Sequence, residues 1–398
     1  MNSMEDIIFS IKADDLADEP CTLYYRPLTG ETSFLPITLS NKETLPIHRM
    51  SSINDIRKMS ILPNNKCNFN CSYCYAAQGR DTNELSMETI EKALNYFINK
   101  NRTSKPLSVA ILGGGEPLLS WNVTQYAIKT ARELSKEEGV KLELTLVTNA
   151  SLISEEIIKT LKDNDVIVNA SFDLIEDVQN IQRKNFFIVK ENIKYLSASR
   201  VYVTINSTIT PMNVERMDEM VINAAEWFPN ISFMIFEPVI STGLFTNSGD
   251  LRDFYQKYIE GFNKARYTAQ SLGMDVTCRI LKSLDFYQER GCEGRFNICP
   301  NGDITICYCT ASAKDPNFKN RLYGKVTPKE VKIFEDKFKN ICNENVYSFE
   351  KCNNCFAKFN CAGGCMLPND RYSKEFLDEV CYFNKEFIRR ELYNRTLT

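Results

Sequence analysis

The stretch Cys67-Asn68-Phe69-Asn70-Cys71-Ser72-Tyr73-Cys74 decides the fold of this chain. It directly follows the apolar run 59–62, which predicts a buried strand, so its three thiols lie on a short loop at a strand end. Three thiolates can hold three irons of a [4Fe-4S] cluster, and the remaining iron is then free to bind a small molecule. A zinc site usually has four nitrogen or sulfur ligands. This loop offers three, and the only histidine, His48, lies well upstream.

The spacing Cys-x3-Cys-x2-Cys, with an aromatic residue before the last cysteine, resembles the signature of the radical S-adenosylmethionine (SAM) enzymes. The resemblance implies that Cys67, Cys71 and Cys74 hold a [4Fe-4S] cluster and are the catalytic residues, and that Tyr73 contacts SAM. It also implies that the reduced cluster cleaves bound SAM to a 5′-deoxyadenosyl radical. A flavodoxin or ferredoxin is the reductant that this chemistry implies.

Composition excludes several other classes of protein. The formal net charge of -3 gives no basic excess for binding a nucleic-acid backbone, so no nucleic-acid partner is expected. The acidic start of the chain, residues 1–6, is unlike a secretory signal, and no apolar run approaches the roughly eighteen residues that span a bilayer. We therefore expect a cytoplasmic protein without a membrane partner, whose fifteen cysteines bind metal rather than form disulfides. The sequence indicates no oligomeric state.

Strands and helices are expected to alternate from residue 57 to about residue 279. Apolar runs predict strands at 60–62, 107–112, 142–147, 166–171, 201–209 and 231–236. The clearest helix is predicted at 86–100, where Ser86 caps the first turn and apolar residues line one face. Six such units predict an α/β fold with a parallel sheet and outer helices. Their number is similar to the partial (β/α)6 TIM-like barrel of the radical SAM family, in which ligands lie at the carboxyl ends of the strands.

Three regions are expected along the chain. Residues 1–56 form an N-terminal region with a β-hairpin at 22–36. This hairpin is either a ribbon packed on the main domain or a peptide-docking element, although the region is short for a complete docking domain. Residues 57–284 form the radical SAM core, and residues 285–398 form a cysteine-rich domain.

A glycine-rich turn follows the second predicted strand, in Leu112-Gly113-Gly114-Gly115-Glu116-Pro117. Glycines permit close backbone approach and unusual dihedral angles, and a carboxylate can accept hydrogen bonds from a cationic amine. At this place in the chain, the turn resembles the GGE motif of the radical SAM family. The resemblance implies that Gly114, Gly115 and Glu116 bind the amino group of SAM. An ordinary turn between strand and helix is the alternative.

Further SAM contacts are implied by the ends of the next strands. Asn149 ends a run similar to the family's Thr-Asn-Gly, with Ala150 in place of the glycine. Ser171 and Arg183 resemble the Ser-x-Asp…Arg pattern of the peptide-modifying branch, whose serine and arginine contact the ribose and the carboxylate of SAM. Arginine suits a carboxylate because it can bind it through two parallel hydrogen bonds.

This second pattern departs from the family at several positions. Leu174 stands where the branch usually has glycine, and Gln179-Asn180 stands where it usually has His-Asp. Asp173 belongs to the Ser-x-Asp pattern, and a helix cap is its alternative role. Glu237, at the end of the sixth strand, is a weak candidate for a group that faces the barrel cavity.

Cysteines become frequent after residue 291. The spacing is Cys-x9-Gly-x4-Cys, then Cys-x2-Cys-x5-Cys-x3-Cys, then one more cysteine. This array closely resembles the SPASM domain, whose members hold two auxiliary [4Fe-4S] clusters, and zinc binding is the alternative. The resemblance implies a first cluster on Cys292, Cys307 and Cys365. It implies a second, closed cluster on Cys352, Cys355, Cys361 and Cys381.

The fourth ligand of the first auxiliary cluster is left open by the sequence. Cys299 is the first candidate and Cys309 the second. If neither binds, one iron is open and can take a substrate thiolate. Cys21, Cys278 and Cys342 match no motif and are expected to be buried free thiols.

Together the two motif sets are similar to those of radical SAM/SPASM enzymes that modify peptides. They imply a maturase that abstracts hydrogen from a ribosomally made peptide or small protein and forms a thioether or carbon-carbon crosslink. In the sulfatase-maturing members an aspartate follows the cysteine that matches Cys307, whereas Tyr308 follows it here, which disfavours formylglycine formation. A sulfatase-maturase-like enzyme with a relocated base, and a non-catalytic iron-sulfur electron-transfer protein, are the alternatives.

Overall fold

The computed structural model describes residues 6–39, 43–103, 105–241 and 243–397. Over these residues, the strands of the central sheet are ordered β10-β9-β8-β7-β6-β5-β4-β11-β12-β13-β14. Its parallel strands are β4 (Lys58–Ile61), β5 (Leu107–Ile111), β6 (Leu142–Thr148), β7 (Val166–Ser171), β8 (Val203–Ile209), β9 (Phe233–Pro238) and β10 (Asp275–Thr277). The strands β4 to β9 confirm the predicted ones. The short strand β10 is an addition that periodicity did not indicate.

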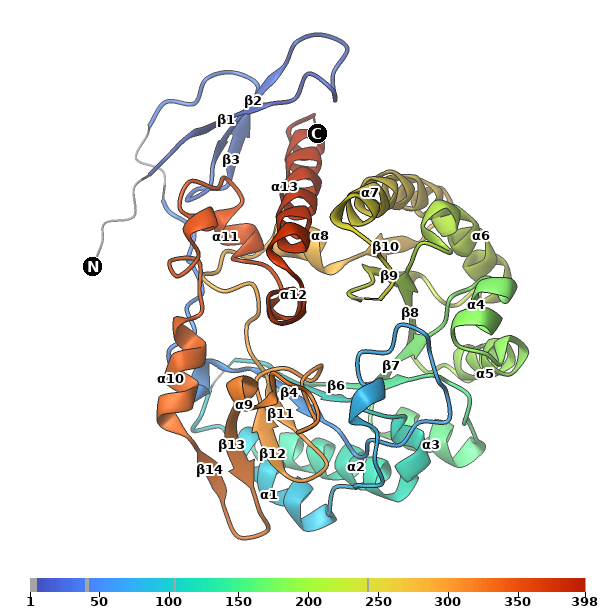
Figure 1. The fold of residues 1–398 in the computed structure, drawn as a ribbon. Helices are drawn as coiled ribbons and strands as arrows, with labels where there is room; N and C mark the ends of the chain where they lie inside the picture. The colour runs from blue at the N-terminus through green and yellow to red at the C-terminus, as the bar shows by residue number, and fades with distance from the viewer. Residues whose placement is uncertain (1–5, 40–42, 104, 242, 398) are drawn as a thin grey trace.

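Helices lie along the outside of the curved parallel sheet (Figure 1). They are α1 (Met87–Phe97), α2 (Trp121–Glu137), α3 (Glu155–Asp163), α4 (Glu176–Gln182), α5 (Phe186–Ala198), α6 (Met217–Trp227) and α7 (Ser248–Ser271), while the short helix α8 (Arg279–Ser283) lies beside the C-terminal helix. The predicted helix at 86–100 is confirmed as α1. The hydroxyl of Ser86 accepts from the backbone N–H of Thr89 at 3.2 Å, and Ile90, Leu94 and Phe97 are buried. The predicted α/β fold with a partial barrel is therefore confirmed.

The C-terminal region continues the same sheet at its β4 edge. β11 (Phe296–Ile298) runs parallel to β4, with Phe296 beside Met59 and Ile298 beside Ile61. β12 (Asp303–Thr305), β13 (Leu322–Val326) and β14 (Val331–Ile333) follow in antiparallel order. The expected boundary near residue 284 thus does not separate two sheets. Instead, the segment 292–307 lies alongside the strand that leads into the Cys67 loop.

The chain then crosses to the other end of the parallel sheet. The helix α9 (Phe318–Arg321) precedes β13, and α10 (Glu335–Asn343) packs on β13 before the crossing. The helices beyond it are α11 (Lys358–Cys361), α12 (Met366–Arg371) and α13 (Lys374–Leu397). α13 packs on α7, where the rings of Tyr255 and Phe383 stack at 4.4 Å and Arg252 pairs with Glu379 at 2.6 Å. The C-terminal region therefore lies across the inner side of the curved sheet (Figure 1). None of the helices in the described ranges is both long and apolar enough to cross a bilayer.

A small sheet precedes the barrel. It consists of β1 (Phe9–Lys12), β2 (Thr22–Arg26) and β3 (Glu31–Ser33), so the hairpin predicted at 22–36 is confirmed and β1 is added to it. The sheet packs on the C-terminal region: the hydroxyl of Tyr25 donates to Asn360 Oδ1 at 2.8 Å, and Arg389 of α13 pairs with Asp15 at 2.7 Å. Most of the acidic start of the chain, residues 1–5, lies outside the described residues.

Candidate functional site

The cysteine loop after β4 is attached to the glycine-rich turn after β5. The side-chain amide of Asn64 donates to the Glu116 carbonyl at 3.0 Å, and its Oδ1 accepts from the Lys66 N–H at 2.8 Å. The Glu116 N–H donates to the Lys66 carbonyl at 2.6 Å. These bonds hold the first part of the loop against the turn. Sequence reasoning did not identify Asn64, because a single asparagine after a strand carries no distinctive signal.

The three positions of this turn require glycine because other atoms lie too close to each Cα to leave room for a Cβ. A Cβ on Gly115 would lie 1.7 Å from the Lys66 carbonyl oxygen, and one on Gly114 would lie 2.5 Å from Asn65 Oδ1. Neither glycine has a positive φ. The close approach that glycine permits is therefore what this turn requires, and neither position needs a left-handed backbone. At Gly114 and Gly115 the segment that leads into the cysteine loop occupies the space of a side chain, and at Gly113 a Cβ would lie 1.7 Å from the Gly115 carbonyl oxygen of the turn itself.

Glu116 is buried at the same place and is held by the end of β6. One carboxylate oxygen accepts from Thr148 Oγ1 at 2.6 Å and from the Leu118 N–H at 3.1 Å, and the other accepts from the Asn149 N–H at 2.8 Å. Burial raises the pKa of this carboxyl, and the three donors oppose that shift. A carboxylate has about four acceptor positions. One position therefore remains for a cationic ligand.

Asn149 links β6 to the cysteine loop. Its Nδ2 donates to Asn68 Oδ1 at 2.9 Å, and its Oδ1 accepts from the N–H and the hydroxyl of Ser151. Asn68 also donates to the Ser151 hydroxyl at 2.9 Å. The loop, the glycine-rich turn and the end of β6 are thus joined by side chains that the sequence places 32 to 83 positions apart.

The thiols of Cys67, Cys71 and Cys74 lie close enough for their charges to interact with one another. The Arg80 guanidinium donates to Cys74 Sγ at 3.8 Å, and Arg183 lowers the pKa of Cys71 against the larger raising effect of burial. The Ser72 N–H donates to the Gln182 carbonyl at 3.0 Å, which ties the loop to the end of α4. The structure therefore brings the three predicted ligands together with cationic groups near them.

Both positions where the family's glycine is replaced keep a left-handed backbone. φ is 55° at Ala150 and 61° at Leu174. Residues other than glycine adopt this conformation at a cost of about 1–2 kcal/mol. Ala150 is held by Asn192, which donates to its carbonyl at 2.8 Å, and Leu174 by Asn223, which does so at 2.9 Å. The substitutions thus leave the backbone of the site in the conformation that glycine favours.

Leu174 provides a direct test of this strain. Its side chain is fully buried, so Leu174→Ala is expected to cost about 2–5 kcal/mol through lost packing. Leu174→Gly loses the same packing but relieves the left-handed backbone. We expect it to be about 1 kcal/mol more stable than Leu174→Ala, the reverse of the usual order. Urea unfolding of the two cluster-free variants measures the difference, and an alanine variant at least as stable as the glycine variant would contradict the strain.

Arg183, Tyr73 and Asp173 form a buried group beside Cys71. Arg183 Nη1 donates to the Tyr73 hydroxyl at 2.9 Å, and that hydroxyl donates to Asp173 Oδ1 at 3.4 Å. Among the described residues, Arg183 Nε and Asp173 Oδ2 are buried without a hydrogen-bond partner. Unpaired groups of this kind are costly unless a ligand completes them. These residues therefore fit a polar ligand such as SAM, whose carboxylate suits Arg183.

The helix-cap interpretation of Asp173 is wrong. The N-cap of α4 is Ile175, and it makes no side-chain cap bond. Asp173 is instead held through its backbone, whose N–H donates to Gln179 Oε1 at 3.0 Å. The Gln179 amide also donates to the Lys184 carbonyl at 3.1 Å. Gln179, which departs from the family pattern, therefore bonds both to Asp173 and to the backbone next to Arg183.

Ser171 is half-buried at the end of β7, as predicted.

The charge of Asp173 is expected to oppose folding of the cluster-free protein. Burial raises the pKa of Asp173 from 3.8 to about 6, although Arg183 and Tyr73 oppose the shift. A carboxyl whose pKa is higher in the folded state destabilises that state when ionised. This free-energy cost to folding is absent below pH 3.8, grows between pH 3.8 and about pH 6, and reaches its full size above about pH 6. A shift from 3.8 to about 6 corresponds to about 3 kcal/mol.

Asp173→Asn is therefore expected to stabilise the cluster-free protein at pH 8 by up to about 3 kcal/mol, with a gain that shrinks toward pH 4. Urea unfolding across this pH range checks the prediction. Asp165→Asn is the matched control, because it makes the same carboxyl-to-amide change at an exposed position. Parallel profiles for the parent and Asp173→Asn would contradict the raised pKa.

The structure brings together the four thiols predicted for the second auxiliary cluster, those of Cys352, Cys355, Cys361 and Cys381. The Cys361 thiol interacts electrostatically with Cys355, Cys381 and Cys352, in decreasing order. These residues come from the loop before α11, from α11 itself and from α13. Cys361 Sγ also accepts from Asn384 Nδ2 at 3.5 Å. Four thiols in one place fit the donor set of a closed [4Fe-4S] cluster.

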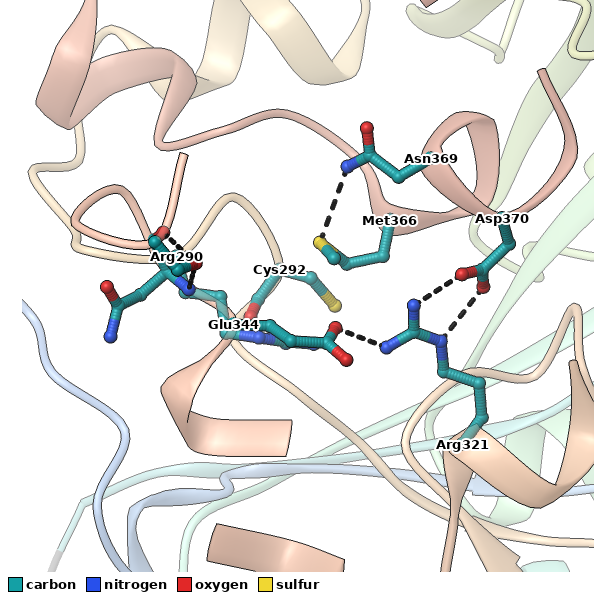
Figure 2. A network of polar contacts seen from close by, with 9 residues as sticks. Arg290, Cys292, Arg321, Glu344, Met366, Asn369 and Asp370 are labelled. Carbon is teal, nitrogen blue, oxygen red and sulfur yellow. Dashed lines mark hydrogen bonds and ion pairs between the residues drawn. The ribbon is translucent and has the colours of Figure 1, made fainter. Parts of the chain in front are cut away.

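The three thiols of the first predicted set, Cys292, Cys307 and Cys365, are also brought together, whereas Cys299, the first candidate for a fourth ligand, bonds within its own hairpin. Cys365 interacts with Cys307 and Cys292, and Cys309 interacts with Cys307 and Cys365. A hydrogen bond from Cys309 lowers the pKa of the Cys307 thiol, as do Arg295 and Arg321. Figure 2 shows the Cys292 sulfur directed toward Met366 and Arg321, whose guanidinium pairs with Glu344 and Asp370.

The loops that carry the two sets are in backbone contact. The Gly291 N–H donates to the Ala362 carbonyl at 2.5 Å, and a Cβ on Gly291 would lie 2.3 Å from the Gly364 carbonyl oxygen. Arg279, at the start of α8, lies near both Cys365 and Cys361, and its backbone N–H donates to Glu237 Oε1 at 2.7 Å. Glu237 thus lies next to the cysteine-rich region, while sequence reasoning missed Arg279.

Within the described ranges, no three histidine, cysteine, aspartate or glutamate side chains are gathered closely enough to hold a single metal ion. A [4Fe-4S] cluster asks for a wider arrangement, because each thiolate binds a different iron. The grouped thiols fit that kind of donor set in composition.

A small cavity lies between the barrel and the C-terminal region. It is lined by Tyr75 and Gly114 from the barrel side and by Tyr308, Cys309 and Asp315 from the C-terminal side, among others. The Tyr308 ring lies edge-on to that of Tyr75 at 6.0 Å, and the Arg295 guanidinium lies over it at 5.2 Å. Tyr308 is therefore packed between the two regions. Tyr75 was not identified from the sequence, because it lies just outside the cysteine motif.

Comparison with known families identifies the barrel segment. Residues 61–224 match the model of the radical SAM superfamily. The radical SAM cyclopropyl synthase TigE of Paramaledivibacter caminithermalis is 27% identical over 199 residues, which cover 45% of this chain and 41% of that protein. The serine-type anaerobic sulfatase-maturating enzyme of Bacteroides thetaiotaomicron is 26% identical over 163 residues, which cover 37% of this chain and 38% of that protein. The matched segments thus span less than half the length of these two relatives.

Comparison with solved structures supports the fold over a longer range. Native anSMEcpe with bound AdoMet has a TM-score of 0.66 at 18% identity, covering 86% of this chain and 99% of that one. Streptococcus suis SuiB bound to its precursor peptide SuiA has a TM-score of 0.58 at 19% identity, covering 81% of this chain and 74% of that one. At these identities the likeness concerns the fold.

Proposed function

We propose that this chain, whose residues 61–224 match the radical SAM superfamily model, is a peptide maturase of that superfamily. It abstracts a hydrogen atom from a ribosomally made peptide and closes a thioether or carbon-carbon crosslink. Residues 57–284 are its radical SAM core, and residues 285–398 are a SPASM domain with two auxiliary [4Fe-4S] clusters. A flavodoxin or ferredoxin is the proposed reductant.

Cys67, Cys71 and Cys74 are the proposed ligands of the SAM-binding cluster. When bound and reduced, this [4Fe-4S] cluster supplies the electron that cleaves SAM to a 5′-deoxyadenosyl radical. The free acceptor position of Glu116 receives the amino group of SAM, and the unpaired Nε of Arg183 donates to its carboxylate. The remaining proposed SAM contacts are Tyr73, Gly114, Gly115, Asn149 and Ser171.

The observation that carries the proposal is the cavity shared by Gly114 and Tyr75 with Tyr308 and Cys309. Crosslinking removes two hydrogens from the peptide. One leaves as a hydrogen atom and gives 5′-deoxyadenosine. The other leaves as a proton when the new bond closes, and one electron must then be accepted. This reaction is supported because Gly114, a proposed SAM contact, and Cys309 of the C-terminal region line the same cavity.

A peptide substrate is supported by two further observations. The structure of SuiB contains its precursor peptide, and SuiB shares this fold. The N-terminal sheet packs on α13 through Arg389 and Asp15, so a peptide bound there would lie on the cysteine-rich region rather than apart from it. We therefore propose that residues 1–56 help to dock the substrate.

The proposal is tested with anaerobically reconstituted protein, SAM, dithionite and the short peptide encoded beside the gene. We expect 5′-deoxyadenosine to form and the peptide to lose the mass of two hydrogens, and fragmentation then locates the crosslink. An unchanged peptide mass with continued deoxyadenosine formation would contradict the crosslinking reaction.

A serine-containing sulfatase peptide is the matched second substrate. An aldehyde on that peptide, detected with a hydrazide, would favour the sulfatase-type alternative. Tyr308 argues against this outcome, because it occupies the position of the maturase aspartate and is packed between Tyr75 and Arg295.

A further inference from the structure

We propose that Cys309 is the fourth ligand of the first auxiliary cluster, together with Cys292, Cys307 and Cys365, and that this cluster has no iron open to substrate. The cluster itself belongs to the proposed function. Its ligand set does not follow from motif spacing, because Cys299 and Cys309 both lie near Cys307 in the sequence.

The contacts of Cys309 are with the other proposed ligands. Its backbone N–H donates to Cys307 Sγ at 3.4 Å, and the two thiols are within hydrogen-bonding reach of each other. Its thiol also lies near Cys365, which in turn lies near Cys292. Four thiols from three separate segments therefore converge, as a [4Fe-4S] cluster with protein ligands alone requires.

The contacts of Cys299 are within its own hairpin. Its thiol lies 3.7 Å from Asn297 Nδ2 and 3.9 Å from Thr305 Oγ1, and its backbone N–H donates to the Asp303 carbonyl at 2.9 Å. The residue is completely buried between β11 and β12. Binding iron would require this hairpin to open. Cys299 is therefore a packed thiol, and the order of the two candidates from the sequence is reversed.

Cationic groups surround the four thiols. Arg295 and Arg321 lie near Cys307, and Arg371 lies near Cys309. Two of these guanidiniums are fixed by carboxylates, Arg321 by Asp370 and Arg371 by Asp315. A fourth thiolate adds a further negative charge to the cluster, and fixed cations nearby stabilise that charge. This arrangement favours four thiolates over three.

A closed first cluster limits the reaction that this enzyme performs. With four protein thiolates, no iron coordination position is left for a substrate sulfur. A cluster held by these four thiolates would serve only as an acceptor for the electron released on bond closure. A crosslink made by this chain consequently does not depend on a substrate thiolate bound to iron.

The test uses the chain with Cys67, Cys71 and Cys74 all changed to alanine, so that the auxiliary clusters alone remain. This parent is compared with its Cys309→Ala and Cys299→Ala derivatives by iron content and by electron paramagnetic resonance of the reduced clusters, with and without cyanide. We expect cyanide to change the spectrum of Cys309→Ala and to leave the parent and Cys299→Ala unchanged. A cyanide response in the parent, or in Cys299→Ala instead of Cys309→Ala, would overturn the assignment.

If Cys309→Ala loses the cluster altogether, Cys309→Ser is used instead, because its hydroxyl can still bind iron. Cys309→Ser is expected to keep about eight irons, four for each cluster, and to show an altered spectrum. An unaltered spectrum would overturn the assignment. The unmodified chain is assayed for 5′-deoxyadenosine in parallel. If no 5′-deoxyadenosine formed, the proposed function would be contradicted. If it formed and the parent still responded to cyanide, only the ligand assignment would be contradicted.

Discussion

Replacing Cys71 by alanine is expected to abolish 5′-deoxyadenosine formation and to remove about four irons per chain. Cys71 lies with Cys67 and Cys74 and beside Arg183, so its loss removes one of three thiolates that no other residue of the loop replaces. Chromatography of reactions with SAM and dithionite measures the product, and a colorimetric assay measures the iron.

Cys21→Ala is the matched control for this prediction. Cys21 lies in the N-terminal sheet region, where its carbonyl accepts from the Ala13 N–H at 2.9 Å, and it matches no cluster motif. Its substitution is expected to leave iron content and product unchanged. If Cys71→Ala still made 5′-deoxyadenosine, the proposed radical chemistry at this loop would fail.

Gly115→Ala is expected to lower the rate of 5′-deoxyadenosine formation by about 100-fold or more. The new Cβ would lie 1.7 Å from the Lys66 carbonyl oxygen and 2.6 Å from Asn64 Oδ1, so the cysteine loop must move. A displacement of about 1 Å at a reacting centre commonly costs about 100-fold in rate. The rate is measured with reconstituted protein whose iron content equals that of the parent.

Gly243→Ala tests whether the effect comes from the loop or from the added methyl group itself. A Cβ at Gly243 would meet no atom within 4 Å, and its φ lies outside the left-handed region. We expect a parental rate for this variant. A parental rate for Gly115→Ala as well would mean that the contact between the turn and the cysteine loop does not position the SAM site.

Much of the barrel could be predicted from the sequence because its signals are local. Side-chain alternation and apolar runs placed β4 to β9 within about two residues of their observed ends, and Ser86 with the apolar face behind it placed the start of α1. The order of parallel strands follows from alternating strands and helices. The spacing of Cys67, Cys71 and Cys74 predicts an iron-sulfur site in the same way, since thiols within one loop are tied together by the chain itself.

What the sequence by itself determined is therefore the type of fold, the radical SAM motifs and the two sets of cysteines. The tertiary structure alone decided how these parts meet. The pairing of β11 with β4 joins residues more than 200 positions apart, and no local pattern specifies such a pairing. The sequence favoured Cys299 over Cys309 as a ligand, yet the closure of the β11–β12 hairpin buries the Cys299 thiol and leaves Cys309 beside Cys307. Distant contacts of this kind depend on the packing of whole elements, which spacing along the chain does not encode.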